Sequence, residues 1–270
     1  MKILTKGTYY GEKRLELENK GIILSEYDYH MPKTDWHYHE NPYFMYVLEG
    51  NVYDVNKKNK TACTSGSLLL HNWNEIHQNT KESDLARGFH VEFERKWYEQ
   101  KKLDVNLWEG SQMIENPAMH HLLGKIYLEF KRRDKYSEVS IDLLLLQLCE
   151  TSQSLDRKLF TKRPPWVEPL KELLHSDHEQ DLSLHFLSNE LGVHPVYLSR
   201  AIPKYFATTL GNYIRQQKVK NAMAYLLNSQ HSLTEIAYLC DFSDQSHFTR
   251  TFKSYMGTTP SAYRSKLQKG

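Results

Sequence analysis

Polar side chains close to the C-terminus could bind the edges of nucleic-acid bases or phosphates. They are Gln245, His247, Thr249, Arg250 and Lys253. A Gln amide can form two hydrogen bonds with adenine and an Arg guanidinium two with guanine, so Gln245 and Arg250 are the strongest base readers. His247 comes next, whereas Ser246 and Thr249 suit phosphate contacts. The chemistry that this stretch favours is recognition of double-stranded DNA.

Two short helices must position these side chains. Ser232 precedes Glu235 by three residues, the spacing of a capping box, which predicts a helix that begins at Leu233. Apolar residues then recur at helical spacing across a break at residues 239–243, and a second helix is expected over about 244–255. The apolar seam that joins the two helices consists of Leu233, Ile236, Ala237, Phe242, Phe248 and Phe252. This is a helix-turn-helix pattern.

The segment DFSDQSHFTRTFKSYMGTTPSAYR at residues 241–264 resembles the signature at the C-terminal end of the AraC family of transcription regulators. It shares the order Phe, Gln, Ser, Phe, Arg, Phe, Lys, then Gly257, and Thr259-Pro260 before Tyr263-Arg264. The resemblance implies a sequence-specific regulator that binds double-stranded DNA, with RNA polymerase as a candidate partner. The alternative is a buried helical hairpin with a solvated basic face.

A similar unit precedes this one. Leu184, Leu187 and Leu191 line its supporting helix and Gly192 makes the turn, while YLSR at residues 197–200 is again similar to the AraC family. Its candidate DNA-binding residues are Val196, Ser199, Arg200 and Lys204. Val196 can touch a thymine methyl group. A long helix over residues 210–228 resembles the connector of the family, which would place the two reading helices on successive turns of DNA.

Three positions depart from the family pattern. Ile202-Pro203 stands where Phe-Lys is usual, and Ala207 and Asp241 stand where Gly is usual. An interior proline costs a helix about 3 kcal/mol, so a kinked or shortened first reading helix is expected. Asp tolerates left-handed backbone geometry better than most residues, so the second unit should survive its substitution. The second unit is therefore the expected main source of specificity.

Charge is divided unevenly along the chain. Residues 194–270 hold 10 Lys and Arg against 3 Asp and Glu, a balance of +7, and the remaining residues, with 25 against 30, carry −5. A basic end of this kind favours phosphate neutralisation and salt-dependent DNA binding.

Length and composition limit the remaining possibilities. The 270 residues suggest two domains, and no apolar run approaches the roughly 20 residues of a membrane span. The N-terminus lacks the apolar stretch of a signal peptide. The three cysteines, Cys63, Cys149 and Cys240, are widely spaced, as expected for unpaired thiols in the cytoplasm. We therefore expect a cytoplasmic protein with no membrane partner.

The N-terminal third predicts a small β-barrel or sandwich. Short β-branched and aromatic runs alternate with turn-forming clusters; they occupy residues 21–29, 43–48, 51–55, 67–70 and 89–93. Placed around His37-Tyr38-His39 and His77, they resemble the two halves of a cupin barrel, the sensing domain of many AraC-type regulators. The expected fold class is α+β multidomain: a cupin-like barrel with two following helices, then an all-α domain with two helix-turn-helix units.

The cupin resemblance raises the question of a metal. In metal-binding cupins, three histidines and a Glu bind the ion, and His37, His39 and His77 match those histidines. The Glu position falls at Tyr43 or Phe44, so no metal or other cofactor is expected and the protein is not expected to be an enzyme. A metal-dependent cupin enzyme that uses the three histidines is the alternative.

A ligand pocket is the expected use of the barrel. Aromatic and imidazole side chains gather at its expected mouth; the predicted ligand-binding residues are Trp36, His37, His39, Tyr43, Tyr46, Trp73 and His77. Such a lining suits a small polar organic effector, for example a sugar. Alternatively, Phe44, Tyr46 and Phe93 fill the barrel core. A regulator that senses no ligand and acts through a protein partner is a further alternative.

Helices and a linker complete the prediction. Asn116-Pro117 should start one helix, and a second, over about 138–152, is apolar on more than one face, which suggests a homodimer. Burial of both faces within one subunit is the alternative. The predicted division is residues 1–155 for the ligand-sensing and dimerisation domain, 156–165 for the linker and 166–270 for the DNA-binding domain.

Overall fold

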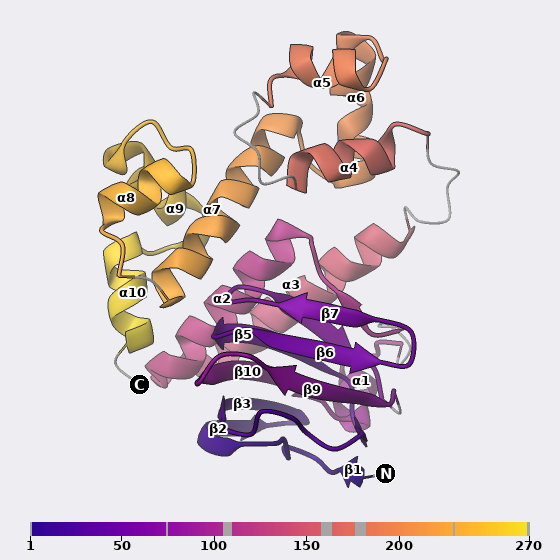
Figure 1. The fold of residues 1–270 in the computed structure, drawn as a ribbon, viewed down its shortest axis with the longest axis vertical. Coiled ribbons are helices and arrows are strands. Elements are labelled where there is room, and N and C mark those ends of the chain that lie inside the picture. The colour runs from indigo at the N-terminus through magenta and orange to yellow at the C-terminus, as the bar shows by residue number, and fades with distance from the viewer. Residues whose placement is uncertain are drawn as a thin grey trace.

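The computed structural model describes residues 2–73, 75–104, 110–157, 164–175, 182–228 and 230–268. Figure 1 shows the β-sheets at one end of the molecule and the C-terminal helices at the other, with α2 and α3 between them. Most of the predicted linker lies outside the described residues. No helix in the described ranges combines the length and apolar character that a membrane crossing requires.

Two facing sheets form the N-terminal domain. The five-stranded sheet has the order β1 (Lys2–Leu4), β4 (His37–His39), β9 (His77–Lys81), β6 (Val52–Asn56) and β7 (Lys60–Cys63). The six-stranded sheet has the order β11 (Gln112–Met113), β8 (Leu68–His71), β5 (Tyr43–Glu49), β10 (Ala86–Phe93), β3 (Ile22–Tyr29) and β2 (Glu12–Asn19). The five predicted strands correspond to β3, β5, β6, β8 and β10.

Strand β5, inside the six-stranded sheet, is buried on both faces. Phe44 and Tyr46 belong to the large core that the helices cover, whereas Tyr43 and Met45 belong to a separate cluster inside the barrel. Successive side chains of a strand point to opposite faces, so this alternation follows directly from the strand geometry. The barrel interior and the helix-facing core are thus built from alternate residues of the same strands.

Helices α1 (Arg95–Lys101), α2 (Pro117–Arg132) and α3 (Ser137–Arg157) follow the sheets. The predicted start of α2 is confirmed: the Asn116 side chain accepts hydrogen bonds from the backbone N–H groups of Ala118 and Met119. Helix α3 is longer than the predicted 138–152. One face of α3, with Ile141, Leu145 and Leu148, is buried in the large core.

The C-terminal part is helical. Its elements are α4 (Val167–His175), α5 (Leu184–Glu190), α6 (Pro195–Phe206), α7 (Leu210–Asn228), α8 (Leu233–Leu239), α9 (Gln245–Met256) and α10 (Pro260–Gln268). The capping box at α8 is present: the Ser232 hydroxyl accepts from the Glu235 N–H, and the Glu235 carboxylate accepts from the Ser232 N–H. The two predicted helix pairs and the predicted connector are therefore confirmed.

Proline 203 does not shorten the first reading helix. Helix α6 continues through Pro203 to Phe206 and has 12 residues, as α9 does. Its buried seam consists of Leu198, Ala201, Ile202 and Phe206, and this burial outweighs the loss of one backbone hydrogen bond. The prediction of a shortened helix was wrong.

The other two departures adopt the backbone geometry of the glycines they replace. Ala207 has φ +59° and Asp241 has φ +55°, both in the left-handed region. The prediction that Asp241 preserves the second turn is confirmed. Ala207 carries the larger strain because it has no polar side chain to compensate.

The buried clusters do not follow the predicted domain division. One hydrophobic core runs from the six-stranded sheet through α2 into α7, α8, α9 and α10. The first helix-turn-helix has a core of its own, formed by α4, α5, α6 and the start of α7. The second unit is thus packed against the sensor domain, which the predicted division into separate domains did not anticipate.

Replacing Ala207 by Gly should raise the free energy of unfolding by about 1 kcal/mol, because left-handed geometry costs a residue with a Cβ roughly that much. Gly257→Ala is the matched opposite change: Gly257 also ends a helix with positive φ, and an added Cβ would meet nothing within 4 Å. Urea denaturation followed by circular dichroism measures both. Equal or lower stability of Ala207→Gly would contradict the strain at this position.

Candidate DNA interface and ligand cavity

Helix α9 presents its predicted base readers to solvent. Gln245, Ser246 and Arg250 are exposed, His247 and Thr249 are half-buried, and Phe248 and Phe252 are buried on the opposite side. Residues separated by three to four positions share one helix face, so Gln245, Ser246, Thr249 and Arg250 form a single polar surface. The described fold brings these predicted residues together.

Local hydrogen bonds orient the start of α9. The Gln245 Oε1 accepts from the Thr234 hydroxyl at 2.6 Å, which leaves the amide N–H₂ of Gln245 available as a donor. Asp244 caps the helix by accepting from the His247 N–H at 2.7 Å. The His247 Nδ1 lies 3.0 Å from the Ser243 hydroxyl. Helix α8 and the turn therefore hold Gln245 and His247 in place before any DNA contact.

Helix α6 offers a second polar face. Val196, Ser199, Arg200 and Lys204 are all exposed, at spacings that place them on one side of the helix. Tyr197, 50% exposed, lies beside them and was not predicted. The His194 side chain caps the helix by accepting from the Val196 N–H. Both polar faces are joined through α7, whose 19 residues span about 28 Å.

A cavity opens into the barrel interior. Its lining combines aromatic rings, imidazoles and short polar side chains: Tyr9, Tyr10, Gly11, Tyr29, His30, Met31, Thr34, His37, His39, Tyr43, Met45, Val52, Asn79, Thr80, Lys81 and His90. Residues from the N-terminal segment close part of it, since Tyr9 stacks on His90 with ring centroids 3.7 Å apart. The cavity has the mixture of flat apolar faces and polar groups typical of sites for small polar molecules.

Only some of the predicted ligand residues reach this cavity. His37, His39 and Tyr43 line it. Trp36 is 41% exposed and lines a different hollow, with Lys2 and Lys57. Tyr46 faces the helices and belongs to the large core, so its assignment as a pocket residue is corrected by the alternation of β5. Trp73 is half-buried and does not line the cavity.

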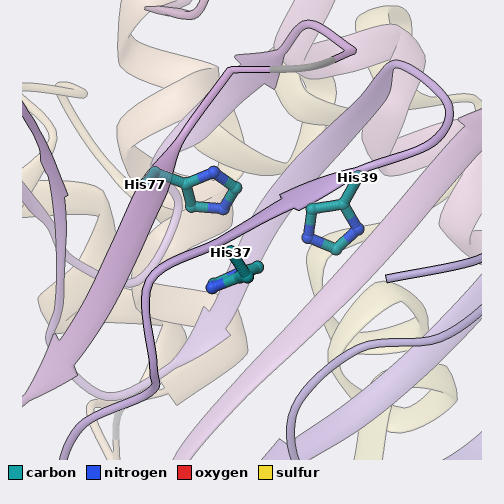
Figure 2. A group of neighbouring side chains, drawn as sticks. All are labelled: His37, His39 and His77. Carbon is teal, nitrogen blue, oxygen red and sulfur yellow. The ribbon is translucent and has the colours of Figure 1, made fainter. Parts of the chain in front are cut away.

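The three predicted histidines converge inside the barrel, as Figure 2 shows. His37 and His77 are direct partners of adjacent strands, with ring centroids 4.3 Å apart. One potential ligand atom from each of the three residues lies within 4.8 Å of the others. Tyr43, at the position of the fourth ligand, approaches the His77 Nε2 with its hydroxyl to 3.4 Å. Three imidazoles are thus available to an ion, and among the described residues this group includes no carboxylate.

Burial keeps these rings neutral. It lowers the pKa of His77 to about 3 and the pKa of His39 well below its usual range, and the neighbouring histidines add to both shifts. The Nδ1 of His37 lies 2.8 Å from the Asp35 carbonyl oxygen, which fixes the proton on Nδ1 and leaves the lone pair on Nε2. Neutral imidazoles can accept hydrogen bonds from a ligand or bind a metal ion.

Sequence reasoning missed several residues of the barrel interior. Asp54, His71 and His90 are buried there, and Glu92 is buried beside Tyr9, whose hydroxyl donates to it at 2.9 Å. A signal was present in the sequence: His90 and Glu92 alternate with Phe89, Val91 and Phe93 along β10, as polar and apolar faces of one strand should.

Two protein-family models match this chain. The model of an AraC-like ligand binding domain matches residues 19–149, and that of a helix-turn-helix domain matches residues 187–266. The first range contains the barrel with α2 and most of α3. The second contains both reading helices and the connector α7.

Similar proteins include an uncharacterised HTH-type transcriptional regulator of Staphylococcus aureus, 21% identical over 81% of this chain and 31% of that protein. The Msm operon regulatory protein of Streptococcus mutans is 29% identical over 38% of this chain and 37% of its own length. The chain thus spans about a third of these curated relatives.

Among solved structures, ToxT of Vibrio cholerae with bound unsaturated fatty acid is 16% identical, with a TM-score of 0.39, over 92% of this chain and 96% of that one. Together the two family models cover both the barrel and the C-terminal helices of the chain. The chain belongs to the AraC family of transcription regulators, with a cupin-like ligand-binding domain followed by a helix-turn-helix domain.

Proposed function

We propose that this protein is a cytoplasmic regulator that binds double-stranded DNA with sequence specificity through α6 and α9, under the control of a small molecule in the barrel cavity. The observation that carries the proposal is the pair of exposed polar helix faces joined through the single helix α7. The family consists of transcription regulators and not of enzymes, so the alternative of a metal-dependent enzyme has no support.

The second unit carries most of the base specificity in this proposal. Gln245 is oriented by Thr234, and α9 packs on the core that extends into the sensor domain. A reading helix that is held before binding loses less conformational freedom on DNA than a mobile one. Helix α6 contributes Val196, Ser199 and Arg200 to bases and Lys204 to phosphate. RNA polymerase is a candidate partner to which no residue is assigned.

The effector is a small polar organic molecule, and a sugar is one candidate. His37, His39 and Tyr43 are the predicted ligand residues that line the cavity, and Asn79 and Lys81 add polar groups to its lining. Sugars present hydroxyl groups to such polar side chains and C–H faces to aromatic rings. A core continuous from the six-stranded sheet to α9 supports communication between effector and DNA.

A homodimer through α3 completes the proposal. Opposite its buried face, α3 and the residue before it expose an apolar stripe, Tyr136, Val139, Leu143 and Leu146, which are 64%, 63%, 57% and 37% exposed. The spacing of three and four residues is that of a coiled-coil seam. A second copy of the chain can cover the stripe with the same residues by two-fold symmetry.

Arg250→Ala should weaken binding to a preferred DNA site by roughly 1 to 3 kcal/mol and relax the preference at one base pair, because an Arg that reads guanine discriminates between bases. Lys204→Ala is the comparison and should weaken binding to all DNA sequences to the same extent, because it removes a phosphate contact. Fluorescence anisotropy on a site selected from random duplexes, with single-base variants, measures both. Uniform weakening by Arg250→Ala would refute its role as a base reader.

A bound effector should raise the melting temperature of the full-length protein. Stabilisation follows mass action and reaches about 2.7 kcal/mol at a ligand concentration 100 times Kd. Thermal-shift screening against sugars and aromatic acids should find a ligand whose effect falls in His39→Ala and persists in Trp36→Ala, since Trp36 lies outside the cavity. A ligand that stabilises His39→Ala as strongly as the wild type would place the effector elsewhere. Failure to find any stabilising compound across broad panels would count against ligand sensing.

Leu143→Glu should convert a dimer of the full-length chain to monomers, because it inserts a charge into the centre of the apolar stripe. Ile3→Glu introduces the same charge at another exposed apolar residue, 54% exposed on β1, and should leave the dimer intact. Sedimentation velocity at micromolar concentration distinguishes the two states. A monomeric wild type, or a dimer that tolerates Leu143→Glu, would rule out this interface.

A further inference from the structure

A polar cluster next to the ligand cavity has no part in the proposed function. It consists of Asp54, His71 and His77, which are 6%, 1% and 3% exposed. Strands β6 and β9 are neighbours in the five-stranded sheet, and β8 lies in the facing sheet, so both walls of the barrel contribute. One potential ligand atom from each residue lies within 4.8 Å of the other two. Two imidazoles and a carboxylate therefore converge in the barrel interior.

The ring nitrogens of His71 form fewer hydrogen bonds than the polar atoms of the other two residues. Among the described residues, neither of its ring nitrogens has a hydrogen-bond partner. The Asp54 Oδ1 lies 3.8 Å from the His71 Nε2, too far for a hydrogen bond. A buried imidazole whose donor and acceptor are both unused is costly in free energy. A cation between His71 and Asp54 would use the free lone pair.

Asp54 supplies negative charge that the described part of the chain leaves unbalanced. It accepts one hydrogen bond, from the Asn79 amide at 3.1 Å, and its ion-pair contact in the described ranges is with His71. Buried carboxylates are normally paired with a cation or bound to a metal. The neighbouring trio of His37, His39 and His77 contains no carboxylate and so supplies no negative charge to an ion.

His77 is oriented for ligation. Its Nδ1 lies 3.1 Å from the Glu75 carbonyl oxygen, so Nδ1 carries the proton and Nε2 offers its lone pair. A carbonyl partner of this kind is the usual outer contact of a metal-bound histidine. The Tyr43 hydroxyl, 3.4 Å from Nε2, competes only weakly.

We propose that Asp54, His71 and His77 bind one divalent transition-metal ion, Zn²⁺ or Fe²⁺, in the barrel interior. Two imidazoles and one carboxylate form a ligand set that both ions accept, and it leaves coordination positions open. Because one His77 lone pair cannot serve two ions, occupancy here excludes an ion on the trio with His37 and His39. The proposal does not rest on DNA or effector binding, since metal content is measured without either.

Titration of the full-length, chelator-treated protein with Co²⁺ tests the site, because the visible absorption of bound Co²⁺ depends on its ligands. Loss of that absorption on addition of Zn²⁺ shows that Zn²⁺ binds at the same site. We expect one Co²⁺ per chain. Asp54→Asn and His71→Asn should each weaken binding by at least about tenfold. His39→Asn, which removes a ligand of the other trio alone, should retain the Co²⁺ spectrum, as should the control His185→Asn at an exposed position on α5.

Circular dichroism establishes whether each variant is folded. Asp54→Asn removes the charge with little change in size, so its Co²⁺ affinity tests the site even if His71→Asn does not fold. Absence of Co²⁺ and Zn²⁺ binding by the folded wild type would overturn the proposal. Binding that is lost in His39→Asn and retained in His71→Asn would overturn it as well, by placing the ion on the histidine trio.

Discussion

The packing of α2 between the six-stranded sheet and the second helix-turn-helix is the constraint on which the arrangement of this molecule depends. Gly124 lies at this contact: a Cβ there would lie 2.3 Å from the Met223 Cε, at the end of a flexible side chain, and 3.2 Å from the Tyr263 hydroxyl oxygen, so these side chains would have to shift. The other side of α2 packs on the sheet, where Tyr127 donates to the buried Glu26 carboxylate. The six-stranded sheet, α2 and α9 therefore share one close-packed core. A shift of one of these elements should move the others, because a close-packed interior transmits displacement.

The two DNA-binding units differ in how they are held. The first unit has its own core and is joined to the rest of the described structure through α7, which contacts α2 by the hydrogen bond between the His121 Nε2 and the Gln216 carbonyl oxygen. An ion pair between Lys220 and Glu115 adds a surface contact of small energy. The second unit packs on the core that extends into the sensor domain, whereas the first is positioned by α7. The two units therefore differ in their packing, and they do not differ in the length of their second helices.

Local signals predicted the helices well. The capping box at Ser232 and the Asn116-Pro117 start depend on residues within one turn, so the sequence contains the whole interaction. Features that require strand register were not accessible. His71 meets Asp54 only through the pairing of two sheets, and Tyr46 was misassigned because both faces of β5 are buried. The prediction that Pro203 shortens the helix was wrong because a local penalty was not weighed against the burial of a whole helix face.

The alternation along β5 also has an evolutionary consequence. Its odd-numbered side chains, Tyr43 and Met45, line the cavity, and its even-numbered ones, Phe44 and Tyr46, seat the helices. Substitutions at the odd-numbered positions change the lining of the cavity, while the core that the helices cover stays intact. In evolution, the cavity can therefore change by single substitutions while the core on which the second helix-turn-helix packs is kept.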